Sequence, residues 1–263
     1  MQPASPPLAF CSRSQLVDAL DALLQPALFR DYGPNGLQVE GREQVGHIVS
    51  GVTASLALID AAIAAGADAI LVHHGLFWRG QDGRLTGWMK QRVARLLAHD
   101  ISLIAYHLPL DAHPQWGNNA QLAARLGWLA DDAPQGRFGE QALGWLGRNT
   151  LGHGSAVELA RHMESTLGRP VTCVDAPGRL PKRIAWCTGG AQSYFEAAIA
   201  AGADVFVTGE ISEPQAHYAR ECGVAYIACG HHASERFGAP AVAAEVAHRL
   251  GLVHTFIDIP NPA

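Results

Sequence analysis

Charge is scarce in this chain of 263 residues, because only 16% of them are charged, against about 25% in an average soluble protein. The formal net charge is −5, which argues against an extended basic face that binds nucleic acid. Long hydrophobic runs are also missing, since Asp60 and Asp68 interrupt the best candidate for a membrane span. With 48% hydrophobic residues, the chain can still bury a large core. A folded surface this short of charge predicts contact with further copies of the chain.

Cysteine is the next scarcity. The five cysteines are odd in number and form no C-x-x-C pair, which is typical of a reducing compartment rather than of a disulfide framework; they are Cys11, Cys173, Cys187, Cys222 and Cys229. The first residues, MQPASPPLAF, lack the basic and apolar regions of a signal peptide. We therefore expect a cytoplasmic protein.

Short apolar strands alternate with helices along most of the chain, which is typical of an α/β protein with a largely parallel sheet. The pattern predicts helices over 14–24, 55–65, 91–99 and 155–167, the last with a capping box from Ser155 to Glu158, and strands over 48–53, 69–72, 101–106, 141–146 and 171–174. The middle of the chain has a weaker pattern, so we place a domain boundary near 127–133. The expected halves are 1–128 and 129–263, with a C-terminal strand that can cross back to the first half.

One octamer occurs twice in the chain. AAIAAGAD spans 61–68 and again 197–204, and both copies run into an apolar strand. Alanine-rich helices can match by chance, but His107 also corresponds to His231 and Asp111 to Glu235, both at an offset of 124 (231 − 107 and 235 − 111). We therefore interpret the chain as two similar α/β halves related by an internal pseudo-repeat, with a metal site in the cleft between them. Ligands of open parallel sheets gather at the carboxyl ends of strands, which is where these polar residues fall.

Histidine and carboxylate side chains gather where predicted strands end. The clusters are His73-His74, His107 with Asp111, Gly209-Glu210, and His231-His232 with Glu235. A lone histidine after a strand is more often structural, but four histidines and two carboxylates arranged by a repeat favour metal binding. Neighbouring strand residues point to opposite faces, so His73 and His74 suit two adjacent ions better than one. Glu235 follows His231 by four residues, which puts both on one face if a helix begins there, and a carboxylate between two cations can bridge them.

Other candidates are weaker. His232 can turn away from the site, and Cys229 is better interpreted as a buried apolar residue than as a thiolate ligand. Gly189-Gly190 follows a strand and could cradle a phosphate, but without a dinucleotide fingerprint or a Walker lysine a tight turn is favoured. The remaining histidines considered lack carboxylate partners in the pattern and are interpreted as structural: His99, His113, His153, His162, His217, His248 and His254.

Several rare strings occur in the same order as in one known family. They are YGPNGLQVEG, GVTAS, GADAILVHHGLFW, HLPLDAHPQWGNNAQLA, AWCTGG, VTGEISE, GHHASERFG and FIDIPNPA. From about Asp31 to the C-terminus, the chain thus resembles the GTP cyclohydrolase 1 type 2 homologue family, also called NGG-one-interacting-factor-three-like, and above all its short bacterial members. The resemblance implies two α/β domains, a dinuclear metal site and a toroidal homohexamer. By match to the family's motifs, the metal ligands would be His73, His74, Asp111, His231 and Glu235, with Glu235 bridging, and His107 would lie just outside them.

The sequence therefore predicts a metal-dependent hydrolase that holds two divalent ions per subunit, and Fe, Mn, Zn, Co and Ni all suit this ligand set. Two cations would lower the pKa of a bridging water, so that hydroxide is available near neutral pH. His107 is the candidate catalytic residue, as a proton shuttle, because the ordinary pKa of an imidazole is about 6.5. The family name suggests a nucleotide or a related heterocycle as the small-molecule substrate, and ring opening and phosphoester cleavage both fit this chemistry.

Two other functions stay open. A metal-loaded hexameric scaffold that binds a partner protein would have closed, saturated metals, whereas a hydrolase leaves positions for water and substrate. A nucleotide-binding regulator would use the Gly189-Gly190 turn and would need a phosphate-binding cation that the sequence does not identify.

Overall fold

The computed structural model describes residues 10–263 and divides the chain into two compact units. The first unit runs to Leu110 and takes up the chain again from Ala239 to Ile259, and the second holds residues 111–238 and 260–263. Both units are α/β, as the sequence predicts. The division falls within the short helix α4 (Leu108–Ala112), so the boundary expected near 128 lies inside the second unit. Within residues 10–263, no helix is long and apolar enough to span a membrane.

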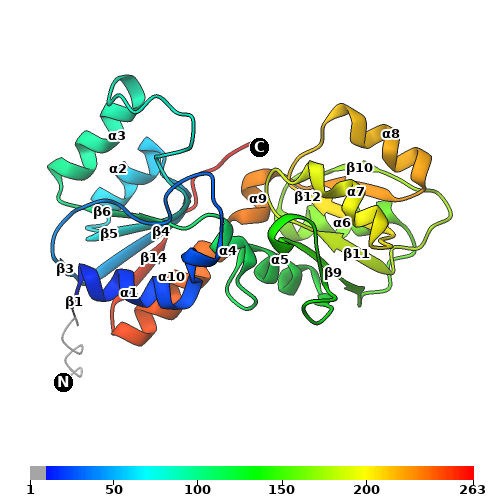
Figure 1. Cartoon of the computed structure of the whole chain (residues 1–263), viewed down its shortest axis with the longest axis horizontal. Coiled ribbons are helices and arrows are strands. Elements are labelled where there is room, and N and C mark those ends of the chain that lie inside the picture. The colour runs from blue at the N-terminus through cyan, green and yellow to red at the C-terminus, as the bar shows by residue number, and fades with distance from the viewer. Residues whose placement is uncertain (1–9) are drawn as a thin grey trace. The chain divides into compact units, whose positions relative to one another are not determined.

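The first unit is built on a five-stranded sheet of order β14-β4-β5-β6-β2, in which β2 is antiparallel to β6 and the other pairs are parallel. One face packs against α2 and α3 in a core that includes Leu58, Val72 and Val93, and α1 and α10 lie on the other face (Figure 1). Strand β14 brings the end of the chain back to this sheet. The elements are β1 (Cys11–Ser12), α1 (Arg13–Leu24), β2 (Gly36–Val39), β3 (Gln44–Val45), β4 (His47–Thr53), α2 (Leu56–Ala64), β5 (Ala69–His74), α3 (Gly87–Ala98), β6 (Ser102–Ala105), α4, α10 (Gly238–Leu250) and β14 (Val253–Phe256).

Two elements of the first unit differ from the sequence prediction. Strand β5 extends through the histidine doublet, and the backbone of His74 pairs with Thr53 of β4, because the parallel ladder continues to that point. Helix α3 begins at Gly87, four residues before the predicted start. Its buried stripe starts at Met89 and continues at helical spacing, so the amphipathic pattern is one turn longer than predicted.

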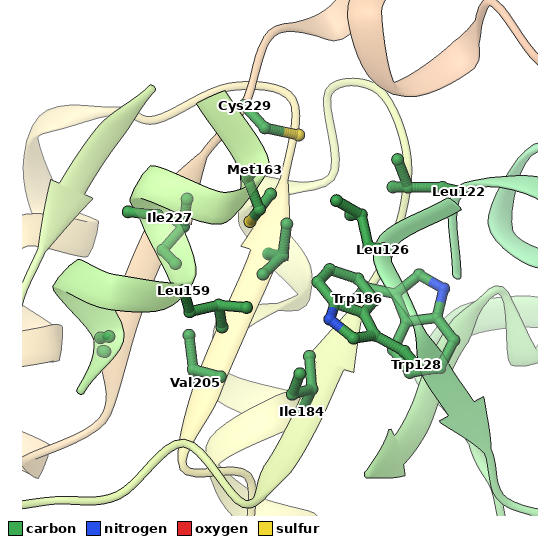
Figure 2. Packing of buried hydrophobic residues seen from close by; sticks show 14 of the residues in the cluster. Leu122, Leu126, Trp128, Leu159, Met163, Ile184, Trp186, Val205, Ile227 and Cys229 are labelled. Atoms are coloured by element: carbon green, nitrogen blue, oxygen red, sulfur yellow. The ribbon is translucent and has the colours of Figure 1, made fainter. Parts of the chain in front are cut away.

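The second unit has a seven-stranded mixed sheet. Its central strands β11, β12 and β13 are parallel, and β9 and β10 flank them in the antiparallel direction. One face packs against α5 and α6, and Figure 2 shows side chains of this core, among them Leu126 of α5, Leu159 of α6 and Trp186 of β11. The elements are α5 (Asn118–Leu126), β7 (Trp128–Ala130), β8 (Arg137–Phe138), β9 (Gly144–Asn149), α6 (Ala156–Leu167), β10 (Thr172–Val174), β11 (Arg183–Trp186), α7 (Phe195–Ala200), β12 (Val205–Thr208), α8 (Glu213–Cys222), β13 (Ala225–Ala228) and α9 (His231–Glu235).

Local predictions in the middle of the chain are only partly right. Where the pattern predicts a strand over 141–146, Glu140–Ala142 form a 3-10 turn with two left-handed residues, and β9 begins only after it. The predicted capping box is half formed. Ser155 Oγ accepts a hydrogen bond from Glu158 N, but the Glu158 carboxylate accepts one from Gly154 N instead of closing the box.

The repeated octamer has the same local structure in both units. Each copy ends a helix, turns at a glycine with positive φ and enters a strand, Gly66 before β5 and Gly202 before β12. Gly66 N donates to Ile63 O, and Gly202 N donates to Ile199 O in the same way. Glycine adopts this left-handed conformation at low cost. The match between the two octamers is therefore structural as well as sequential at this turn.

Candidate metal-binding site

Three imidazoles lie together in the first unit. His73 and His74 end β5, and His107 follows β6. The ring centroids of His73 and His74 are 4.5 Å apart, and the His107 ring is 5.0 and 5.7 Å from them. Each ring can offer one nitrogen to a metal ion, and these nitrogens all lie within 4.8 Å of one another. His107, predicted to lie just outside the ligands, thus belongs to the same cluster as the doublet.

A hydrogen-bond partner orients each of the three rings through its Nδ1 atom. For His73, His74 and His107 the partners are Tyr106 O at 3.1 Å, Thr53 Oγ1 at 3.1 Å and Asp31 Oδ1 at 2.7 Å. Histidines that bind metals characteristically hold one ring nitrogen with such a partner and present the other to the ion. Nε2 is therefore the atom that each ring presents, and the donor set fits a divalent transition metal.

Asp31 is a residue that the sequence analysis missed. Its side chain is 3% exposed, and its carboxylate accepts hydrogen bonds from His107 Nδ1, Asn35 Nδ2 and Leu108 N. Burial would raise the pKa of Asp31, but the hydrogen bond and charge of His107 outweigh it, and the pKa falls to about 2. Asp31 is thus a fixed anion behind the His107 ring. The feature of the sequence that could have identified Asp31 is its position in a turn, four residues before Asn35.

In the second unit, His231 lies between two carboxylates. Its Nδ1 donates to Glu210 Oε1 at 2.6 Å, and its Nε2 is 3.1 Å from Glu235 Oε2. Helix α9 begins at His231, so His231 and Glu235 share one helical face, as predicted. Burial alone would lower the pKa of His231, but hydrogen bonds and charge from the two carboxylates raise it to about 9. The carboxylates of Glu210 and Glu235 favour a positive charge at the His231 imidazole, and either a proton or a metal ion can supply that charge. Glu210, whose role the sequence left open, therefore orients His231 as Asp31 orients His107.

Asp111 is buried in the second unit, and polar neighbours hold it in place. Its Oδ1 accepts hydrogen bonds from Asn118 Nδ2 at 2.9 Å and Thr188 Oγ1 at 3.1 Å. Asn119 Nδ2 donates to its backbone oxygen. An amide and a hydroxyl commonly orient a ligating carboxylate in this manner. Both asparagines begin α5, and the sequence alone gave them no role.

The Gly189-Gly190 turn supports Glu235 rather than a phosphate. Gly189 has a φ of +73°, and a Cβ there would overlap Glu235 Oε1. Its backbone N donates to Ser234 Oγ, and its carbonyl accepts a backbone hydrogen bond, so both groups are used within the fold. The Glu210 carboxylate lies beside Gly190 and would repel a phosphate. These contacts disfavour the nucleotide-binding regulator.

Among residues 10–263, the cysteine thiols do not belong to the groups that could hold a metal ion. Burial raises the pKa of Cys229 to about 12 and holds that of Cys187 well above its ordinary range. Cys229 packs in the apolar core of the second unit, in keeping with the interpretation of it as a buried apolar residue. His232 is buried in α9 and does not belong to the metal-capable groups found among residues 10–263.

A family model and several known proteins are similar to this chain over most of its length. A family model described as Duf34/NIF3 (NGG1p interacting factor 3) matches residues 11–262. A protein of Neisseria meningitidis serogroup A, named GTP cyclohydrolase 1 type 2 homolog, is 52% identical over 241 residues, which cover 91% of this chain and 94% of that protein. A protein of the same name from Escherichia coli K12 is 47% identical over 253 residues, 95% of this chain and 99% of the relative. A solved structure described as protein ybgI, of unknown function, has 46% identity and a TM-score of 0.90 and covers 96% of this chain and 100% of its own.

Proposed function

This chain belongs to the Duf34/NIF3 family, and on that premise we propose that it is a dinuclear metal-binding protein that acts as a metal-dependent hydrolase. The observation that carries the proposal is the way in which hydrogen bonds hold four histidine rings of the two units. His73, His74, His107 and His231 all have Nδ1 held by a polar partner. Holding one ring nitrogen in this way is characteristic of histidines that bind metals.

In this proposal the ligands are His73, His74, Asp111, His231 and Glu235, and residues of both units serve the same pair of divalent ions, with Glu235 bridging. When bound, such cations act as Lewis acids that make a water molecule more acidic and polarise the bond under attack. The shared turn of the two octamers and the matched His and carboxylate positions support a pseudo-repeat that provides this ligand set. Fe, Mn, Zn, Co and Ni all suit its donors.

His107 is the residue we expect to carry a proton. Its Nδ1 is committed to Asp31, so Nε2 is the atom that would take a proton from the nucleophile and return it to the leaving group. Asp31 holds the His107 ring in one orientation through this hydrogen bond. The substrate we propose is a nucleotide or a related heterocycle, in keeping with the printed name of the relatives, and either ring opening or phosphoester cleavage suits these groups.

Chelation and reloading test the hydrolase. The full-length protein should carry about two divalent ions per chain by elemental mass spectrometry. Turnover of at least one member of a panel of purine nucleotides, pterins and phosphodiesters should fall at least about tenfold after treatment with EDTA and return when one of the five metals is added back. Ring opening is followed by ultraviolet absorbance and ester cleavage by phosphate release.

The main alternative, a metal-loaded scaffold, predicts a different result from the same experiment. A scaffold would keep its full metal content and turn over no member of the panel in any loaded form, and that outcome would contradict the hydrolase. A protein that binds no divalent metal would contradict both functions.

We also propose that the chain forms a homohexamer in the cytoplasm. Large apolar side chains are exposed on the first unit, among them Leu28, Leu85 and Leu97, and the low charge of the chain leaves few charged residues to surround them. Size-exclusion chromatography with light scattering should give a mass about six times the 27.9 kDa of one chain. Elution as a monomer would overturn this part of the proposal.

A further inference from the structure

An open pocket of about 320 Å³ lies in the first unit, beside the imidazole cluster. Two segments form it, residues 31–34 and residues 77–79. Its volume is at the lower end of the range for sites that bind small molecules, about 300–1,000 Å³. None of the lining residues belongs to the proposed ligand set, so the function proposed above leaves this pocket unexplained.

Aromatic side chains make the walls of this pocket. Tyr32 is 56% exposed, so its ring is accessible to a ligand in the pocket. The indole of Trp78 meets the His107 ring edge to face, with centroids 5.0 Å apart and planes at 88°, and lies 6.0 Å from the His74 ring. Tyr32 also reaches His107, at 6.1 Å. A ring bound against these walls would therefore lie next to the imidazoles.

The two segments hold each other in place before any ligand arrives. Arg79 N donates to Tyr32 O at 2.6 Å, and Arg79 Nη2 donates to Asp31 O at 2.8 Å. A Cβ on Gly33 would overlap Phe77 O, so the close approach of the segments requires glycine at that position. Asp31 is in turn fixed to His107. A pocket built in this way loses little conformational entropy when it binds a ligand.

A second, smaller cavity shares part of its lining with the pocket and is also lined by His73 and His107. Its volume of about 10 Å³ suits a single water molecule. Trp78 and Phe77 line both spaces, whereas His73 and His107 line only the smaller one. The smaller cavity thus lies against Phe77 and Trp78 of the pocket wall and against two of the imidazoles.

The pocket also has a cation at its rim. Arg79 is exposed, and within residues 10–263 the hydrogen bond to Asp31 O is the one that its guanidinium makes, so the other N–H groups face solvent. A guanidinium in this situation binds phosphate or carboxylate. Aromatic walls and an adjacent cation together match a planar ring that carries an anionic group.

We propose that the pocket of Tyr32, Phe77, Trp78 and Arg79 is the subsite that receives the planar aromatic ring of the substrate, with Arg79 binding its anionic group. This inference rests on the proposed function, because it places the ring beside the groups that would act on it. Stacking on Trp78 and Tyr32 provides the affinity and is indifferent to the identity of the ring. Arg79 distinguishes charged from uncharged ligands.

Binding to the metal-free protein tests this subsite separately from catalysis. Full-length protein treated with EDTA is titrated calorimetrically with guanosine monophosphate, guanosine and ribose 5-phosphate. Guanosine monophosphate should bind best and ribose 5-phosphate at least about tenfold more weakly, because one stacked base contributes roughly a factor of ten or more. Trp78→Ala should weaken both guanosine ligands about tenfold, and Trp78→Phe much less. Arg79→Gln should weaken guanosine monophosphate and leave guanosine unchanged. Trp88→Ala, which removes an exposed tryptophan of α3 in the same unit, is the matched control.

Three outcomes would decide against the subsite. Guanosine ligands that do not bind, or that bind equally to the Trp78→Ala and Trp88→Ala variants, would overturn it. Ribose 5-phosphate binding as well as guanosine monophosphate would show that the ring is not what the pocket recognises. If Trp78→Ala weakens binding but the metal-loaded wild type hydrolyses nothing in the panel, the subsite stands and the proposed hydrolase fails.

Discussion

Glu235→Ala is expected to lower the affinity for divalent metal by at least about a hundredfold, since loss of a mere supporting partner already costs roughly 10–100-fold. Glu235 is 2% exposed and its Oε2 lies 3.1 Å from His231 Nε2, so the substitution removes an anionic oxygen donor from a buried position. As the proposed bridge, it would contribute to both ions at once. The measurement is metal content after dialysis, followed by competition with a chelator of known affinity. Glu245→Ala is the matched control, because Glu245 pairs with Arg249 on α10 and should leave metal content unchanged.

Gly189→Ala separates geometry from charge in the same test. Its Cβ would overlap Glu235 Oε1 and lie 3.2 Å from His231 Nε2, at a backbone position with positive φ. Every charged group remains, so a fall in metal affinity in this variant reports the positions of Glu235 and His231 and not a loss of charge. If Glu235→Ala keeps the wild-type metal content, Glu235 is not a ligand, and the bridging role is wrong.

Trp186→Ala is expected to destabilise the second unit by about 3–5 kcal/mol, the usual cost of emptying a buried aromatic site. This is a large share of the roughly 5–15 kcal/mol that stabilises a typical domain. Trp186 is 0% exposed and packs against Trp128 and Trp145, with ring centroids at 5.3 and 5.9 Å; Figure 2 shows the first of these contacts. Urea unfolding followed by circular dichroism measures the loss.

The same substitution should reach the candidate site. Trp186 Nε1 donates to Asn119 O at 3.1 Å, and the Asn119 side chain in turn holds Thr188 N and Asp111 O. Trp186→Phe keeps most of the ring and loses only this donor, so it should cost less stability than the alanine variant. The exposed Trp88→Ala should change stability by no more than about 0.5 kcal/mol. Equal unfolding midpoints for Trp186→Ala and Trp88→Ala would show that Trp186 is not central to the core.

Residues close in the sequence were the ones that pattern could assign. The histidine doublet ends an apolar strand, and His231 and Glu235 share a helical face at a spacing of four. Both features need only the period of a strand or a helix. The octamer was visible as an identical string, and its two copies form the same turn because that turn is closed by hydrogen bonds between near neighbours.

Partners distant in the sequence were the ones that pattern could not assign. Asp31 and His107 are 76 positions apart, and Asn119 and Trp186 are 67 apart. No periodicity relates such positions. The hydrogen bond between His107 and Asp31 exists only because the loops before β2 and after β6 meet in the folded unit. The aromatic pocket has the same origin, since Tyr32 and Trp78 come together across two loops.

The sequence by itself thus determined the α/β class and the family, because each depends on composition, short-range period or matched strings. The tertiary structure decided how those groups are held: Asp31 behind His107, Glu210 behind His231, and glycine at 189 beneath Glu235. It also decided that the first unit ends at Leu110, whereas the sequence placed the boundary near 128 and allowed for the return of a C-terminal strand, which β14 makes. The physical reason is that orientation comes from long-range hydrogen bonds and packing, which form only when separate elements have already met.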